Sequence, residues 1–232
     1  MLKAHTEKKG VSFFGISLFT VFDLKGVMRN EQGPPWNNSK EISEQFRRIV
    51  YGKMALMGRK TYESLAAHEI TNDFFSKKTP VTLHLVLTKE KKYPIKEEHF
   101  AYKIHSLVDI QNIWLEIEKE TYIGGGRVLP FKPEIVVIGG VSLYQEMLDY
   151  ADTIHAILYH SEFSGDEYFP LFFNTREWKM DGVVDSREKR KDGHCLYTFV
   201  TYRRIHTVKK QLPLLPFIPP SPSPPKEPRE KT

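Results

Sequence analysis

Short apolar runs alternate along this chain with segments whose apolar residues recur every three or four positions. The apolar runs predict buried strands over 13–22, 54–57, 83–88, 135–138, 154–160 and 196–202. The periodic segments predict helices over 40–50, 61–67, 107–118 and 142–150. Ser106, with Asp109 three residues later, gives the third helix a capping-box start. Strands that alternate with helices indicate an α/β sheet with crossover helices.

The end of the chain differs in composition from the rest. Residues 211–232 contain eight of the fifteen prolines. Because proline fixes φ and lacks a backbone donor, neither helix nor sheet is expected there. We therefore expect an N-terminal extension over 1–11, one folded domain over 12–206, and a disordered Pro-rich tail over 207–232. The tail is either a solvated terminus or a polyproline-type ligand for an aromatic groove on a partner protein.

Composition and charge narrow the class of protein. Hydrophobic residues make up 40% and charged residues 27% of the chain, which is ordinary for a globular domain. The net charge is +5, but residues 208–232 hold five basic and two acidic side chains, so the rest carries +2 and does not indicate nucleic-acid binding. The single cysteine, Cys195, leaves no cysteine cluster for a metal.

The N-terminal region does not indicate export or membrane insertion. The apolar run over 13–22 is about half the length that a membrane-spanning helix needs. Residues 1–10 lack the apolar core of a secretory signal. We therefore expect a cytoplasmic protein with no membrane segment, and we expect it to be a monomer.

One predicted strand-to-helix turn carries residues that suit a phosphate site. In the segment MALMGRKTYESL, Gly58, Arg59, Lys60 and Thr61 follow the end of the strand and open the helix. Free backbone N–H groups at a helix start attract phosphate, and two adjacent cations suit an extra ribose phosphate. Taken alone, a turn with a solvated basic pair explains these residues equally well.

A second turn, in the segment EIVVIGGVSLYQEML, joins a β-branched strand to a helix through Gly139 and Gly140. Glycines at this point let the backbone approach a pyrophosphate closely. The full G-x-G-x-x-G pattern is missing, which disfavours a conventional Rossmann domain. A similar glycine run over 124–126 follows a polar helix end and not a strand, so we expect it to be a surface loop.

Taken in order, the motifs ISLFTVFD, GPPWN, LMGRKTYESL, LVLTK, VIGGVSLYQEML and GDEYFP resemble the dihydrofolate reductase family. The resemblance runs from about Ser12 to Arg204, and Gly139-Gly140 precedes Gly165-Asp166 by the interval that the bacterial enzymes show. It implies an α/β fold with a mixed, mostly parallel eight-stranded sheet flanked by about four helices. It also implies an NADPH-dependent enzyme of one-carbon metabolism that reduces 7,8-dihydrofolate to 5,6,7,8-tetrahydrofolate.

The resemblance assigns NADPH to the two turns. It implies that Gly58, Arg59, Lys60 and Thr61 hold the adenosine side and its 2′-phosphate, and that Thr88 and Lys89 close on the same phosphate. Val27 and Met28 are implied to lie in a mobile loop over the nicotinamide. The residues implied to receive the pyrophosphate and shield the nicotinamide are Gly139, Gly140, Val141, Ser142, Leu143 and Tyr144.

On the pterin side, the resemblance implies a backbone carbonyl from Val21, a wall formed by Trp36, and an entrance lined by Ser64 and Leu65. A carboxylate on the pterin's amidine edge would fix its orientation and favour its protonated form.

Two registers compete for the position of that carboxylate. Counting five residues from Trp36 gives Glu41, followed by Ile42 as the neighbouring apolar residue; counting back one helical turn from Phe46 gives Ile42 instead. At about 100° per residue, Glu41 lies at the rim of the buried arc of its helix. We favour Glu41, against the reading that it only solvates the helix edge.

Three pterin-side features of the family pattern are altered. A threonine that hydrogen-bonds the acid falls on Ile157, and an arginine that binds the substrate's glutamate carboxylate falls near Thr82, with Lys77 and Lys78 as unassigned substitutes. The proline-rich segment before that arginine is replaced by AHEITNDFFSKK. The alternative function is therefore an NADPH-binding protein of this fold with another small heterocyclic substrate or a non-catalytic structural role.

Overall fold

The computed structural model describes residues 14–29, 39–67, 74–75, 82–123, 132–170 and 177–205, with side chains to 116 in the helix that ends at 123. Several sequence predictions lie outside these residues. They concern Trp36, Lys77, Lys78, the glycine run 124–126, and the terminal segments 1–11 and 207–232.

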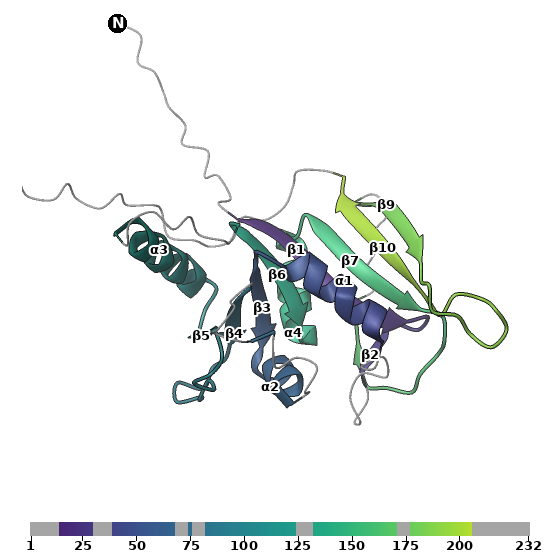
Figure 1. Ribbon diagram of the computed structural model, residues 1–232, viewed down its shortest axis with the longest axis horizontal. Helices are drawn as coiled ribbons and strands as arrows, with labels where there is room; N and C mark the ends of the chain where they lie inside the picture. Colours follow the sequence, from purple (N-terminus) through teal and green to yellow (C-terminus); the bar gives the residue numbers. More distant parts are fainter. Residues whose placement is uncertain are drawn as a thin grey trace, which may run out of the picture.

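A mixed eight-stranded sheet forms the centre of the described structure (Figure 1). Its strands are β1 (Gly15–Asp23), β3 (Met54–Gly58), β4 (Leu83–Leu87), β5 (Ala101–Ile104), β6 (Glu134–Gly139), β7 (Thr153–Tyr159), β9 (Trp178–Asp185) and β10 (Tyr197–Arg204). They lie in the order β5-β4-β3-β6-β1-β7-β10-β9. All pairs from β5 to β7 are parallel, and β10 runs antiparallel to both β7 and β9. A separate ribbon pairs β2 (Val27–Arg29) with β8 (Glu167–Tyr168).

Four α-helices accompany the sheet in the described part of the chain: α1 (Lys40–Val50), α2 (Arg59–Ala67), α3 (Val108–Ile123) and α4 (Val141–Met147), the last continuing as a 3₁₀ turn over Leu148–Tyr150. Together with the sheet they confirm the predicted fold class. Helix α1 matches its predicted bounds because Ser39 caps it, accepting a hydrogen bond from the N–H of Ile42. Helix α2 begins two residues before its predicted start, so Arg59 follows β3 directly.

The core explains why the parallel strands could be predicted. Strands β3, β4 and β6 are buried along almost their whole length. Parallel strands covered on both faces have continuous apolar sequences, as these do. On the α1 side of the sheet, the ring of Phe46 packs 5.2 Å from that of Phe19 on β1.

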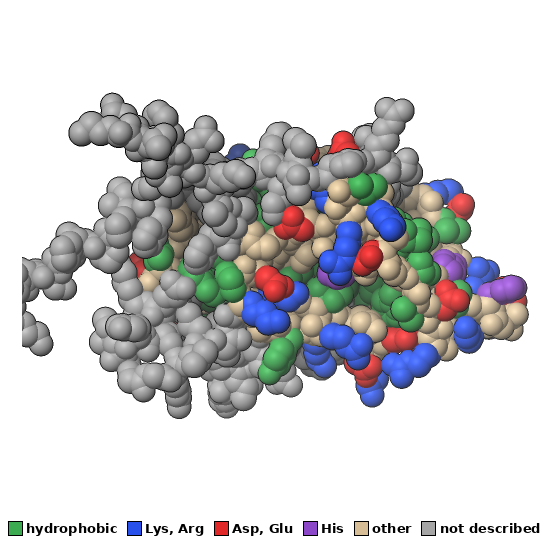
Figure 2. Space-filling model, turned by 90° about the horizontal axis from the view of Figure 1, so that it is seen from above, with side chains coloured by type: hydrophobic (Ala, Val, Ile, Leu, Met, Phe, Trp, Pro, Cys, Tyr) green, Lys and Arg blue, Asp and Glu red, His purple; other side chains and the backbone are tan. Residues whose placement is uncertain are grey.

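The surface is mixed in character. Acidic and basic side chains are interspersed over the described part of the face in Figure 2, with apolar side chains between them. Among the described residues, no helix has both the length and the apolar character needed to cross a bilayer.

Candidate functional site

The two predicted phosphate turns lie side by side. Strands β3 and β6 are parallel neighbours, so their carboxyl ends meet at the same edge of the sheet, with Met57 beside Gly139. The chain leaves β3 through α2 toward β4, and leaves β6 through α4 toward β7, on opposite sides of this pair. Ligands of open α/β sheets bind where crossovers diverge in this way.

Gly139 brings the two turns into contact. Its φ is +147°, a conformation that residues with a side chain rarely adopt, and a Cβ there would lie 2.7 Å from Oγ1 of Thr61 on α2. A Cβ at Gly140 would lie 3.9 Å from the same oxygen, which is an ordinary contact. The glycine at 139 is therefore required by the packing of α2 against the end of β6, whereas the one at 140 is not.

The cationic residues of the first turn lie at the start of α2. The guanidinium of Arg59 makes two long ion pairs, at 3.2 Å to Glu63 and 3.5 Å to Glu90. All three side chains are well exposed, and exposed pairs of this kind contribute about 0–1 kcal/mol. Arg59 can therefore exchange these partners for a phosphate. Lys60 is exposed beside it.

Thr88 and Lys89 follow the end of β4, on the other side of β3 from β6. Thr88 is buried, and its hydroxyl accepts a hydrogen bond from the N–H of Glu90. Its carbonyl lies 2.7 Å from Nδ1 of His105. Lys89 is exposed and adds a cation near the end of the strand that neighbours Arg59.

In α4, Val141 is half-buried and Ser142 is exposed, whereas Leu143 and Tyr144 are buried. Burial raises the pKa of the Tyr144 hydroxyl. This hydroxyl donates a hydrogen bond of 2.6 Å to the carbonyl of Phe19 on β1. Tyr144 therefore fixes α4 against the central strand of the sheet.

Val27 and Met28 lie in β2 and are buried. Strand β2 pairs with β8, and a Cβ at Gly165 would lie 2.4 Å from both the carbonyl oxygen of Arg29 and Cγ1 of Val27. The glycine of the GDEYFP motif is thus the residue that lets this segment pack closely against β2.

Glu41, in the first turn of α1, is only 9% exposed. Its Oε2 accepts hydrogen bonds from the N–H of Arg187 at 3.1 Å and the hydroxyl of Tyr197 at 3.0 Å, and its Oε1 accepts one from Nε of Arg187 at 3.3 Å. Burial alone would raise the pKa of Glu41, but these hydrogen bonds hold it below its ordinary value. The carboxylate is ionised at neutral pH and is bound to the segment between β9 and β10.

The other acid register and its aromatic neighbour point into the core. Ile42 is buried, and Phe46 packs against the rings of Phe19 and Phe74. Val21 is half-buried on β1, and Ser64 and Leu65 are half-buried on α2. Trp36 lies outside the described residues.

The two positions where the sequence departs from the family pattern are both buried. Ile157 on β7 lies between Val21 of β1 and Phe199 of β10. The hydroxyl of Thr82 donates to the carbonyl of Val50 at 3.2 Å. The Thr82 hydroxyl is therefore already hydrogen-bonded to the backbone at the end of α1.

Sequence reasoning missed the partners of Glu41. Tyr197 begins β10, and Arg187 and Glu188 follow β9, so they are about 150 residues from Glu41 in the chain. The hydroxyl of Tyr197 also lies 2.9 Å from Oγ of Ser39, the capping residue of α1. No local sequence pattern predicts contacts between residues so far apart in the chain.

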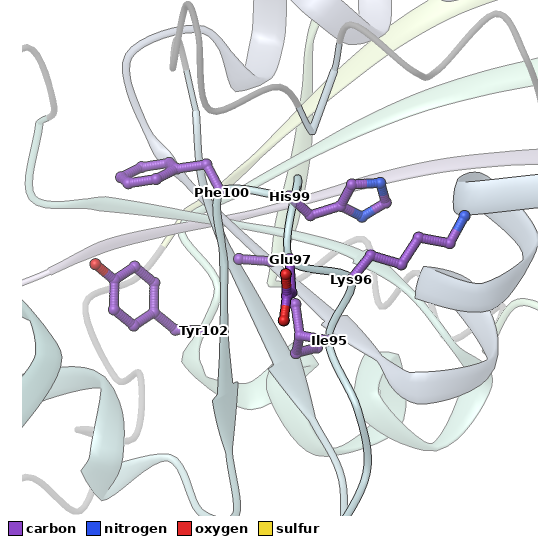
Figure 3. Close-up of a pocket in the computed structure, with 7 residues that line it drawn as sticks. Ile95, Lys96, Glu97, His99, Phe100 and Tyr102 are labelled. Carbon is purple, nitrogen blue, oxygen red and sulfur yellow. The ribbon is translucent and has the colours of Figure 1, made fainter.

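A pocket of about 310 Å³ lies elsewhere, along the segment that leads into β5 (Figure 3). It is lined by residues 95–97 and 99–102, and none of the predicted site residues belongs to it. Lys96 extends from this segment to the carbonyl of Ala66 on α2. Within the described ranges, no group of His, Cys, Asp and Glu side chains is arranged to hold a metal ion.

Comparisons with known proteins agree on one family. A family model described as dihydrofolate reductase matches residues 15–204. The dihydrofolate reductase of Staphylococcus haemolyticus is 26% identical over 194 residues, covering 84% of this chain and 98% of that protein. The enzyme of Bacillus subtilis (strain 168) is also 26% identical over 194 residues, covering 84% of this chain and 97% of that protein.

The fold has a counterpart among solved structures. Dihydrofolate reductase from Enterococcus faecalis, complexed with NADP(H) and RAB-propyl, superposes with a TM-score of 0.59 at 18% identity. The match covers 84% of this chain and 98% of that one. The similarity of fold therefore extends over most of this chain.

Proposed function

This chain belongs to the dihydrofolate reductase family, and from that premise we propose that it reduces 7,8-dihydrofolate to 5,6,7,8-tetrahydrofolate with NADPH. The observation that carries the proposal is the paired turn at the ends of β3 and β6, where Gly139 packs on Thr61 beside the cations of α2. When bound, NADPH supplies the hydride from C4 of its nicotinamide to C6 of the pterin, and a proton is added at N5.

The residues of the paired turn fit a dinucleotide phosphate. Gly140 presents backbone without a side chain at the start of α4, where a pyrophosphate would approach, and Gly139 lets Thr61 pack against the end of β6. Arg59, Lys60 and Lys89 provide positive charge near the ends of β3 and β4, where a 2′-phosphate would be bound. Thr61 and Thr88 border the same region, and Val141 to Tyr144 form the first turns of the helix that follows.

On the substrate side, we propose that Glu41 binds the amidine edge of the pterin. Its carboxylate is ionised and held in one direction, as orientation of a cationic or amidine group requires. Ile42, Phe46 and Leu65 would supply apolar contact, with the carbonyl of Val21, Ser64 and Trp36 completing the site.

The proposal is tested by steady-state turnover of the purified full chain. NADPH absorbance should fall when dihydrofolate is added, and Glu41→Gln should reduce kcat/KM by about tenfold or more, since a hydrogen bond to a charged group contributes about 1.5–3 kcal/mol. Thr82→Val is the matched control, because it removes a hydroxyl at the other end of α1 that we assign no role. Full activity of Glu41→Gln would remove Glu41 from the mechanism.

A second function is favoured by one observation: protein groups already occupy the Glu41 carboxylate. An NADPH-binding protein with another heterocyclic substrate, or with a structural role, would keep these contacts permanently. It predicts NADPH affinity without dihydrofolate turnover and without antifolate binding. Tight binding of methotrexate would count against this alternative.

We further propose that residues 12–206 form the catalytic unit, with 1–11 and 207–232 as flanking segments, and that it works as a cytoplasmic monomer. The family model spans 15–204, which supports these limits. The Pro-rich tail is proposed as a contact for a partner protein. Deleting residues 211–232 should then leave turnover unchanged.

A further inference from the structure

The segment that joins β9 to β10, together with the first residue of β10, supplies every described hydrogen-bond donor to the Glu41 carboxylate. Oε2 accepts from the N–H groups of Arg187, at 3.1 Å, and Glu188, at 3.4 Å, and from the hydroxyl of Tyr197, at 3.0 Å. Oε1 accepts from the N–H and Nε of Arg187, both at 3.3 Å. The two shortest contacts, from Tyr197 and from the N–H of Arg187, are therefore both on Oε2.

Tyr197 is the side chain in this group with a fixed position. It is fully buried, its ring packs against those of Tyr159 and Phe199, and it opens a strand that is paired on both sides. Burial raises the pKa of its hydroxyl, so this group stays protonated and can donate at neutral pH. A buried donor on a strand that is paired on both sides holds its acceptor in one direction.

Arg187 makes a different kind of contact. Its side chain is 80% exposed, and its guanidinium also reaches Glu44 at 3.5 Å. An exposed, long contact contributes little free energy and is readily exchanged. The guanidinium and the amidine edge of a pterin are both planar groups of N–H donors, so one can replace the other on Oε1.

We propose that Tyr197 is a positioning residue that holds the Glu41 carboxylate through Oε2 and leaves Oε1 for the substrate's amidine in exchange for the Arg187 guanidinium. The proposal rests on the proposed function. Under this proposal a residue of β10 orients the acid on α1. It therefore explains how the acid can be oriented although Ile157 stands where the family pattern has a threonine that hydrogen-bonds it.

The charged and titratable groups around Glu41 are few in the described structure. Arg187 and Glu188 face it from the β9–β10 segment and Tyr197 from the start of β10, and Glu44 lies one turn along α1, where it pairs with Arg187. Tyr197→Phe removes one donor to the ionised form and alters none of these charges. The pKa of Glu41 should therefore rise in this variant.

The test compares Tyr197→Phe with the parent in the full chain. The carboxyl carbon of Glu41 is titrated by ¹³C NMR, and its signal is identified by its absence from Glu41→Gln. We expect the Tyr197→Phe titration to lie higher by about one pH unit, because a hydrogen bond to a charged group contributes about 1.5–3 kcal/mol and one pH unit equals about 1.4 kcal/mol. The KM for dihydrofolate should rise about three- to tenfold, with kcat changed by less than about twofold.

Thr198→Val is the matched control. It removes a hydroxyl from the next residue of β10, where the side chain contacts His160 and Asp185 instead of Glu41. Its Glu41 titration and KM should match the parent. An unchanged titration or an unchanged KM in Tyr197→Phe would overturn the proposal.

Failure of the proposed function gives a different result. If the parent shows no turnover, dihydrofolate is not its substrate, and the proposed exchange of the Arg187 guanidinium for the substrate's amidine on Oε1 is wrong. A Glu41 titration that still moves in Tyr197→Phe would then support the Tyr197 contact alone, whereas one that does not move would discard both.

Discussion

Gly139→Ala is the substitution whose cost follows most directly from the structure. The new Cβ would lie 2.7 Å from Oγ1 and 2.9 Å from Cγ2 of Thr61. Thr61 is β-branched and cannot turn away freely. Relieving such an overlap costs about 1–3 kcal/mol, and a side chain at a φ of +147° costs a further 1–3 kcal/mol or so.

The free energy of unfolding should therefore fall by about 2–6 kcal/mol in Gly139→Ala. For a chain of this size, that corresponds to a decrease in Tm of about 4–24 °C. Gly140→Ala is the control: its φ is −56°, its Cβ would meet Thr61 only at 3.9 Å, and its stability should change by less than about 1 kcal/mol.

Urea unfolding followed by tryptophan fluorescence measures both variants, and titration with NADPH measures the site. Gly139→Ala should also bind NADPH more weakly than Gly140→Ala. The double variant Gly139→Ala/Thr61→Ala should regain the stability that the overlap with Thr61 removed. It should still lack the stability that the unfavourable φ at residue 139 removes. If Gly139→Ala proves as stable as Gly140→Ala, the described packing of α2 against β6 is wrong.

Two further predictions concern pH and cofactor choice. Burial lowers the pKa of His84 to about 4, so the unfolded imidazole binds a proton near pH 6.5 while the folded one stays neutral. Stability should thus fall by about 2 kcal/mol between pH 7 and 5 on account of this group. In urea titrations, His84→Leu should therefore lose less stability than the parent between pH 7 and 5. An unchanged pH dependence of stability in this variant would refute the role of His84. Arg59→Ala should weaken NADPH binding about ten- to hundredfold and NADH binding by less than about threefold, measured by fluorescence quenching; equal losses would exclude Arg59 from the 2′-phosphate.

The parallel centre of the sheet could be predicted because burial on both faces leaves continuous apolar runs. Strand β9 could not, since its outer position leaves Met180, Val183 and Val184 about half exposed and its sequence, WKMDGVVD, alternates poorly. Strand β5 has only four residues at the opposite edge, and β2 and β8 form a ribbon too short for any periodicity.

The cofactor half and the substrate half of the candidate site also differ in how far the sequence predicts them. The turns at Gly58 and Gly139 could be predicted because a strand, a glycine and a helix start are contiguous in the sequence. The surroundings of Glu41 could not, because Tyr197 is 156 residues away and meets it only through the pairing of β10 with β7. The helical periodicity predicts Glu41 at the rim of α1, and the β9–β10 segment covers Glu41 at that rim.

Deuterium transfer from NADPH to dihydrofolate shows whether this chain catalyses the reduction. The full chain is incubated with dihydrofolate and NADPH that carries deuterium at both C4 positions of the nicotinamide, and the product is examined by mass spectrometry. We expect tetrahydrofolate with one deuterium, at C6. NADPH binding without any deuterated tetrahydrofolate would contradict the proposed hydride transfer.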